Sequence, residues 1–125
     1  MREQLEMGKI ERFEDIIAWQ KARVLVNCVY RITKEGKFSK DFSLRDQVRR
    51  AAMSVMLNIA EGFARRTDKE FAHFLFIAHG SLAEVQSGLY IALDQGYLTQ
   101  QGFDELYVQS NEVSKVISGF IKALR

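Results

Sequence analysis

Apolar residues recur along this chain at intervals of three and four, the spacing that places them on one face of a helix. The alternation of apolar and polar positions that is typical of strands is absent. The pattern therefore predicts an all-α fold. We expect four helices, counted from their capping residues, at about residues 14–34, 43–64, 67–94 and 99–124, with short connections between them.

Capping residues and glycines mark the expected ends of these helices. Gly36 is placed to take the left-handed conformation that ends a helix, and Gly96 lies where the third helix should stop. Ser43 and Asp46 approximate a capping box, and Thr67 with Glu70 forms a closer match. Thr99 is expected to be the N-cap of the last helix.

Four helices of this length, joined by short loops, favour an antiparallel up-down-up-down bundle. Residues 1–13 are expected to form an N-terminal tail, and residues 14–125 a single domain. Inside the second helix, Gly62 indicates a close helix crossing, because glycine is otherwise unfavourable there. Asn58 and Glu61 are expected to hydrogen-bond across to a neighbouring helix and fix its register.

The predicted third helix is apolar around almost its whole circumference. One stripe runs through Phe71, Leu75 and Leu82, while other apolar residues lie on the far side. A four-helix core needs one face from each helix, so we expect a second copy of the chain to cover the far side. The alternative is that this helix lies at the centre of its own bundle. The expected oligomer interface consists of Phe76, Ile77, Gly80 and Ile91.

The charge is unevenly distributed, although 18 basic and 16 acidic residues give a formal total of only +2. Residues 21–66 contain eleven Lys and Arg against four Asp and Glu. Arginine binds phosphate through a planar fork, and arginine-rich faces often contact nucleic acid. Lys37 and Lys40 add to this charge from the connection before the second helix. We expect RNA or DNA to contact Arg23, Arg31, Lys34, Arg45, Arg49, Arg50, Arg65, Arg66 and Lys69.

The alternative interpretation of these charges is a solvated face with local ion pairs. Glu61 would then pair with Arg65, and Asp46 with Arg49 or Arg50. An oligomer changes the balance, because each copy repeats the basic surface and the fields add. We therefore favour nucleic-acid binding.

The sequence offers little catalytic chemistry. A di-metal site in a helical bundle commonly uses two Glu-x-x-His pairs, and only Glu70 with His73 has this spacing. His73 and His79 do not share a helix face. Cys28 is expected to be a small buried thiol. No phosphate-binding glycine loop or nucleophile elbow occurs, so we expect no enzyme, no metal and no cofactor.

The chain is expected to be cytoplasmic and to have no contact with a membrane. Its longest nearly uncharged run, residues 51–60, is much shorter than the roughly 20 apolar residues that a spanning helix needs. Cys28 is the single cysteine, and the N-terminus has no apolar stretch typical of a signal peptide.

Four segments in this order, Phe13–Ala22, Gln47–Ala52, Asn58–Gly62 and Gly80–Glu84, resemble the four-helix bundle proteins encoded in intervening sequences of bacterial 23S ribosomal RNA genes. The resemblance covers about residues 13–125. It implies an antiparallel bundle that assembles into a ring-like homopentamer, with a role in binding nucleic acid, most simply RNA. It implies no catalytic residues.

The chain is also similar to the accessory variability determinant proteins of diversity-generating retroelements. These are basic pentamers of the same fold that bind a reverse transcriptase and nucleic acid. The resemblance implies an alternative function, an accessory scaffold that binds a reverse transcriptase. The sequence departs from its relatives at Met56. The relatives usually have proline in this segment, which would kink the helix, so we expect the second helix of this chain to run unbroken.

Overall fold

The structure is a computed structural model that describes residues 10–124. Within this range four α-helices follow one another, and no strand occurs. The predicted all-α fold is therefore confirmed. The helices are α1 (Ile17–Thr33), α2 (Phe42–Phe63), α3 (Asp68–Asp94) and α4 (Gln100–Leu124), and the short 3₁₀ helices η2 (Phe13–Asp15) and η3 (Gly36–Lys40) precede α1 and α2.

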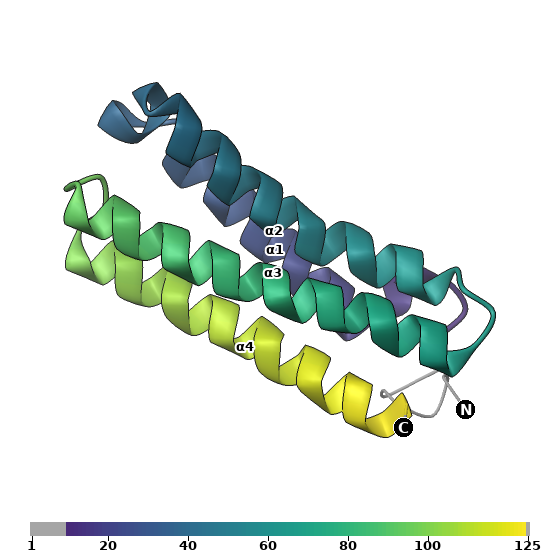
Figure 1. The fold of residues 1–125 in the computed structure, drawn as a ribbon. Helices are drawn as coiled ribbons and strands as arrows, with labels where there is room; N and C mark the ends of the chain where they lie inside the picture. The colour runs from purple at the N-terminus through teal and green to yellow at the C-terminus, as the bar shows by residue number, and fades with distance from the viewer. Residues whose placement is uncertain (1–9, 125) are drawn as a thin grey trace.

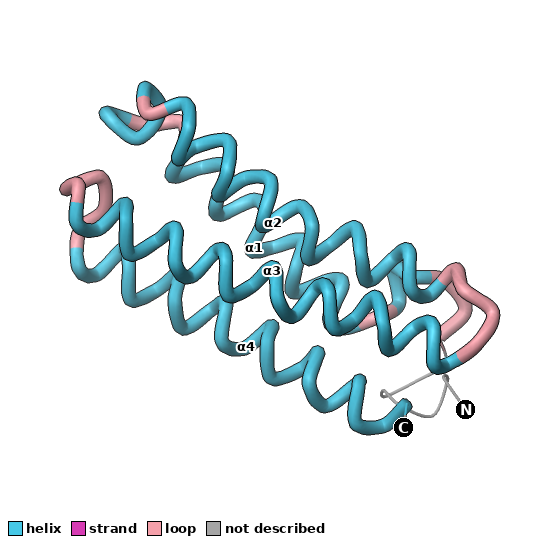
Figure 2. Tube along the Cα trace, viewed as in Figure 1, coloured by secondary structure: helices cyan, strands magenta, loops and turns pink. Residues whose placement is uncertain are grey.

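The four helices form one bundle. Each helix packs against the next one in the sequence, and α1 also packs against α4. The connections lie at alternate ends of the bundle, as Figure 1 shows. The α1–α2 and α3–α4 connections share one end, and the α2–α3 connection lies at the other, where Figure 2 draws it as a loop.

One apolar core runs the length of the bundle. Its largest fully buried side chains include Leu25 of α1, Ile59 of α2 and Ile117 of α4. Burying such a side chain contributes about 1.5–3 kcal/mol to the free energy of folding. Phe38 carries η3 into this core, where its ring lies 5.3 Å from the ring of Tyr97. The core therefore also holds the α1–α2 connection in place.

The segment that precedes α1, residues 10–16, packs on the bundle. Ile10 is buried, and the ring of Phe13 meets that of Trp19 edge-on at 5.2 Å. Residues 1–9 of the expected tail lie outside the described residues.

Several predicted helix ends are confirmed. Gly36 and Gly96 have φ angles of +54° and +76°, the left-handed conformation that favours glycine. Thr67 and Glu70 form the predicted capping box. The Oγ1 of Thr99 accepts a hydrogen bond of 3.0 Å from the backbone N–H of Gly102, as expected of an N-cap.

Two predicted helix starts are wrong. The first helix begins at Ile17 rather than Glu14, because residues 13–15 form η2 and the fully buried Ile16 is extended. The N-cap of α2 is Asp41 rather than Ser43, and its Oδ1 accepts a 3.1 Å hydrogen bond from the N–H of Leu44. The predicted box of Ser43 and Asp46 is therefore absent.

The close crossing predicted at Gly62 is confirmed. A Cβ atom there would lie 2.9 Å from the Cδ1 of Phe71 and 2.9 Å from the Cβ of Phe74, so only glycine lets α2 and α3 approach this closely. The helix is also continuous through Met56, as expected.

The predicted hydrogen bonds from Asn58 and Glu61 to a neighbouring helix are wrong. Asn58 donates to the backbone oxygen of Ser54 at 2.8 Å, within α2. The Oγ of Ser54 then lies 2.8 Å from that of Ser81, and this pair of hydroxyls bridges α2 and α3. Glu61 pairs instead with Arg65, with 3.0 Å between oxygen and nitrogen. The hydrogen bond between α2 and α3 is therefore made by the hydroxyls of Ser54 and Ser81.

Candidate nucleic-acid interface

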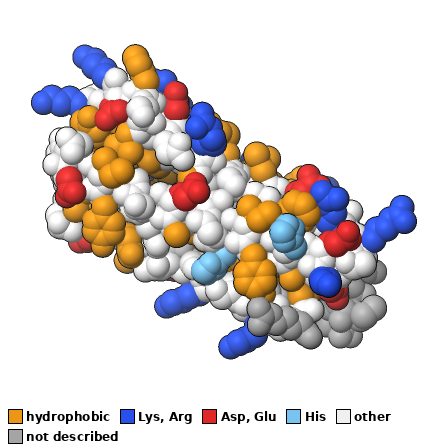
Figure 3. All heavy atoms as spheres, viewed as in Figure 1, with side chains coloured by type: hydrophobic (Ala, Val, Ile, Leu, Met, Phe, Trp, Pro, Cys, Tyr) orange, Lys and Arg blue, Asp and Glu red, His pale blue; other side chains and the backbone are white. Residues whose placement is uncertain are grey.

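The basic residues of the sequence are most concentrated at the end of the bundle that holds η3. Residues 31–50, which we call the basic end, contain seven Lys and Arg against three Asp and Glu. They comprise the last turn of α1, η3 and the first half of α2. Figure 3 shows blue side chains projecting from this end, at the upper left, and further ones at the opposite end.

Five basic side chains of the basic end are exposed, and no ion pair within residues 10–124 involves any of them. The only partner of Arg50 in this range is the Oε1 of Gln47, at 3.4 Å. These side chains are therefore available to phosphate. They are Arg31, Lys34, Lys37, Lys40 and Arg50.

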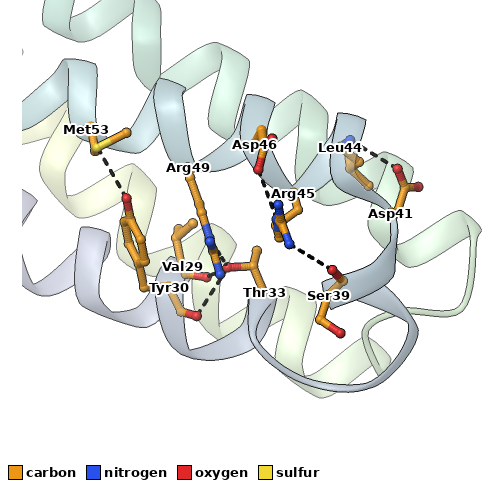
Figure 4. A network of polar contacts seen from close by, with 10 residues as sticks. All are labelled: Val29, Tyr30, Thr33, Ser39, Asp41, Leu44, Arg45, Asp46, Arg49 and Met53. Atoms are coloured by element: carbon orange, nitrogen blue, oxygen red, sulfur yellow. Dashed lines mark hydrogen bonds and ion pairs between the residues drawn. The ribbon is translucent and has the colours of Figure 1, made fainter.

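Arg45 is held by three neighbours, of which Figure 4 shows Asp46 and Ser39. Its Nε donates to the carboxylate of Asp46 at 2.9 Å, and its Nη1 donates to the backbone oxygen of Ser39 at 3.0 Å. Its guanidinium lies 4.7 Å from the ring centre of Phe42, which is 63% exposed. The expected pairing of Asp46 with Arg49 or Arg50 is thus wrong, because the adjacent Arg45 occupies that carboxylate.

Arg49 joins α2 to α1. Its Nε donates a 2.7 Å hydrogen bond to the Oγ1 of Thr33, and its guanidinium lies 4.7 Å from the ring centre of Tyr30. The buried Thr33 hydroxyl in turn donates to the backbone oxygen of Val29 at 2.7 Å, and the Tyr30 hydroxyl to the sulfur of Met53 at 3.3 Å (Figure 4). Arg49 therefore serves first as a structural contact between two helices.

Asp41 links the basic end to the α3–α4 connection. Besides capping α2, its carboxylate accepts a 2.9 Å hydrogen bond from the hydroxyl of Tyr97. This hydrogen bond, with desolvation and the negative charge of Asp41 as smaller causes, raises the pKa of Tyr97 above its ordinary value of 10.0. The link holds the two connections at this end of the bundle together.

The remaining predicted residues lie elsewhere. The fourteen residue-to-residue steps from Arg49 to Phe63, the end of α2, span about 21 Å. Beyond them Arg65 pairs with Glu61, as the ion-pair alternative expected, and lies 4.6 Å from the ring centre of Phe74. Arg66 and Lys69 belong to this opposite end, and Arg23 lies midway along α1. The nine predicted residues therefore do not form one patch.

The second apolar face of α3 is partly exposed. Phe76, Ile77 and Ile91 are 49%, 40% and 48% exposed, and Gly80 is exposed between them. These exposed residues contradict the alternative that α3 lies at the centre of its own bundle. Figure 3 shows hydrophobic side chains on the face of the molecule that includes α3.

The other candidate groups have structural partners. Glu70 accepts hydrogen bonds as part of the capping box with Thr67. The His79 Nε2 lies 2.9 Å from the Oγ of Ser114 on α4. Cys28 is half-buried against the core rather than fully buried.

Residues 10–124 offer neither a cluster of metal ligands nor a membrane-spanning helix. No three His, Cys, Asp or Glu side chains in this range lie close enough together to hold a metal ion. None of the described helices is sufficiently long and apolar to cross a membrane.

Comparison with known proteins gives the family. The chain is similar in fold to a crystal structure of a protein of unknown function from the S23 ribosomal protein family of Bacteroides thetaiotaomicron. The TM-score is 0.77 at 21% identity, over 85% of this chain and 99% of that chain. No curated protein matches the sequence. Residues 14–119 match the family described as 23S rRNA-intervening sequence protein. The chain belongs to the 23S rRNA-intervening sequence protein family.

Proposed function

We propose that this protein is a non-enzymatic, homo-oligomeric nucleic-acid-binding protein, and that its target is RNA. One observation carries the proposal. Five exposed cationic side chains gather at the basic end, and none of them has an ion pair within residues 10–124. Such charges release counterions when they contact phosphates, which is the main source of sequence-independent affinity for nucleic acid.

Phe42 supports a single-stranded target. Phe42 is 63% exposed within the basic end, and the Arg45 guanidinium lies 4.7 Å from its ring centre. The other side of the ring is a surface on which an unpaired base would stack, and stacking of this kind is tolerant of sequence. The expected binding mode therefore combines phosphate contacts with stacking and has little base specificity.

Assembly of several copies would strengthen this binding. The exposed apolar residues of α3 supply a surface for self-association, and we propose that antiparallel bundles join through Phe76, Ile77, Gly80 and Ile91. A ring-like pentamer is the assembly that the family resemblance implies. Because a ring repeats the basic end in every copy, the fields of the copies add.

The test combines a mass measurement with a binding titration. Sedimentation equilibrium gives the number of copies, and fluorescence anisotropy follows the binding of a 30-nucleotide RNA and of an RNA duplex as salt rises from about 50 to 200 mM. The proposal predicts an oligomer that prefers the single strand and loses affinity with salt. A stable monomer, or an oligomer that binds neither RNA at low salt, would contradict it.

A protein-binding scaffold is the second candidate function. The exposed apolar face of α3 favours it, because this face suits a protein partner such as a reverse transcriptase as well as a second copy. A reading frame beside a reverse transcriptase gene and a template repeat would support the scaffold. A reading frame inside a ribosomal RNA gene would support the first proposal.

A further inference from the structure

A surface cleft of about 600 Å³ lies between α3 and α4, near the connection that joins them. Its lining includes three aromatic residues, Tyr90 of α3 with Phe103 and Tyr107 of α4, and the remaining lining residues are Leu93, Gln100, Asp104 and Val108. None of these residues belongs to the basic end or to the expected oligomer interface. Their chemistry therefore needs its own explanation.

The three aromatic rings pack against one another, with Tyr90 exposed, Tyr107 half-buried and Phe103 buried. The ring centres of Tyr90 and Phe103 are 4.7 Å apart, those of Phe103 and Tyr107 are 5.4 Å apart, and those of Tyr90 and Tyr107 are 5.7 Å apart. The faces of such rings carry partial negative charge and attract cations. A guanidinium or ammonium group is thus the ligand that this lining suits.

The charges around the cleft point to the same ligand. Asp104 is exposed, and its Oδ1 accepts a 2.9 Å hydrogen bond from the Nε2 of Gln100, which orients the carboxylate at the cleft wall. Asp104 is the only charged residue among the described residues that line the cleft. A cation in the cleft would contact aromatic side chains as well as the carboxylate of Asp104.

We propose that this cleft binds an arginine side chain from a basic segment of a partner protein. A small free cation would stay largely in water, because the cleft is open and Tyr90 and Val108 are 51% and 58% exposed. A peptide also covers these apolar edges, and arginine with aromatic residues is enriched in protein interfaces. This proposal does not depend on nucleic-acid binding by the basic end.

Binding of two eight-residue peptides to the full chain tests it. One peptide has two central arginines, and the other has citrulline, which is neutral and has nearly the same shape, at both positions. Calorimetry gives the affinity, and the NMR signals of the Val108 methyl groups and the tyrosine rings report the place of binding. Wild-type protein should bind the arginine peptide, with shifts at these signals, and should bind the citrulline peptide at least about fivefold more weakly.

The chain offers a closely matched pair of variants. Asp104 and Glu105 are adjacent carboxylates of α4, and each accepts a hydrogen bond from a glutamine four residues earlier, but only Asp104 lines the cleft. Asp104→Asn and Tyr90→Leu should each weaken binding of the arginine peptide about fivefold, while Glu105→Gln should change it less than twofold.

Three results would overturn the proposal. Equal binding of the citrulline peptide would show that the cation is irrelevant. An equal loss in Glu105→Gln would indicate diffuse attraction to an acidic surface. A lower oligomer mass in Asp104→Asn would mean that a second copy of the chain, rather than another protein, occupies the cleft.

Discussion

The Nε of Arg49 donates a 2.7 Å hydrogen bond to the Oγ1 of Thr33, the last residue of α1. The sequence predicts that Arg49 and Arg50 both contact nucleic acid, but this hydrogen bond gives Arg49 a structural role. Arg49 joins two helices, whereas its neighbour Arg50 is exposed and has only a 3.4 Å contact with Gln47. The two adjacent arginines should therefore respond differently to substitution.

Replacing Arg49 with alanine should lower the free energy of unfolding by about 2 kcal/mol. A hydrogen bond from a charged group contributes about 1.5–3 kcal/mol, and the contact with the Tyr30 ring adds to it. Arg50→Ala should stay within about 0.5 kcal/mol of wild type. Urea unfolding at one fixed protein concentration measures both. Equal losses in the two variants would show that the Arg49 contacts contribute little.

The hydrogen bond from Tyr97 to Asp41 should make stability depend on pH in the alkaline range. The pKa of Tyr97 is raised in the folded protein, so its contribution is fully present below about pH 10 and is lost as pH rises through the raised value. Tyr97→Phe should be less stable at neutral pH and should lack this alkaline loss. Tyr90→Phe is the control, since no described residue hydrogen-bonds to the Tyr90 hydroxyl. Denaturant unfolding from about pH 8 to about pH 11 compares the slopes. Parallel slopes in wild type and Tyr97→Phe would refute the link.

Gly62→Ala should lower the free energy of unfolding by about 1–3 kcal/mol, although alanine is the better helix former. The new methyl group would lie 2.9 Å from side-chain atoms of both Phe71 and Phe74, so α2 and α3 would have to separate. Gly119→Ala on α4 is the matched control, because its added Cβ would have no neighbour within 4 Å beyond the adjacent residues and the backbone of its own helix. The control should gain about 0.5–1 kcal/mol. A gain in both variants, measured by thermal unfolding, would mean that the crossing readily adjusts.

Ile77→Lys should reduce self-association by at least about tenfold, because an unpaired ammonium group in an apolar interface is costly. Val24→Lys is the control. Val24 is also an exposed apolar residue, but it lies on α1 and is not part of the expected interface on α3. Sedimentation velocity of the two variants at equal concentration gives the comparison. An unchanged oligomer in Ile77→Lys would remove this face of α3 from the interface.

Local sequence rules predicted those parts of the fold that depend on neighbouring residues. Thr67 with Glu70, Thr99 and the two left-handed glycines act within one helix turn, and each was found where expected. The start of α2 was missed because Asp41 is fixed partly by Tyr97, which lies fifty-six positions away in the sequence. The start of α1 was missed because the core buries Ile16 in an extended conformation.

The candidate site was harder to predict because charge alone does not show which side chains are already engaged. Arg49 contacts Thr33, sixteen positions earlier, and no local pattern links the two. Arg45 pairs with the carboxylate of Asp46, which the helix spacing assigned to Arg49 or Arg50. The separation of Arg66 and Lys69 from the basic end does follow from the length of α2, and helix geometry applied to the sequence would have shown it.

A salt titration of RNA binding by two charge-matched double variants tests the central proposal most directly. Arg31→Gln with Arg50→Gln removes two exposed charges from the basic end, and Lys115→Gln with Lys122→Gln removes two exposed charges from α4. The first variant should bind a single-stranded RNA more weakly and reduce the slope of log affinity against log salt by about 1.4 for each contacting copy. The second should keep nearly the wild-type slope. Equal changes in the two variants, or no change in the first, would contradict binding through the basic end.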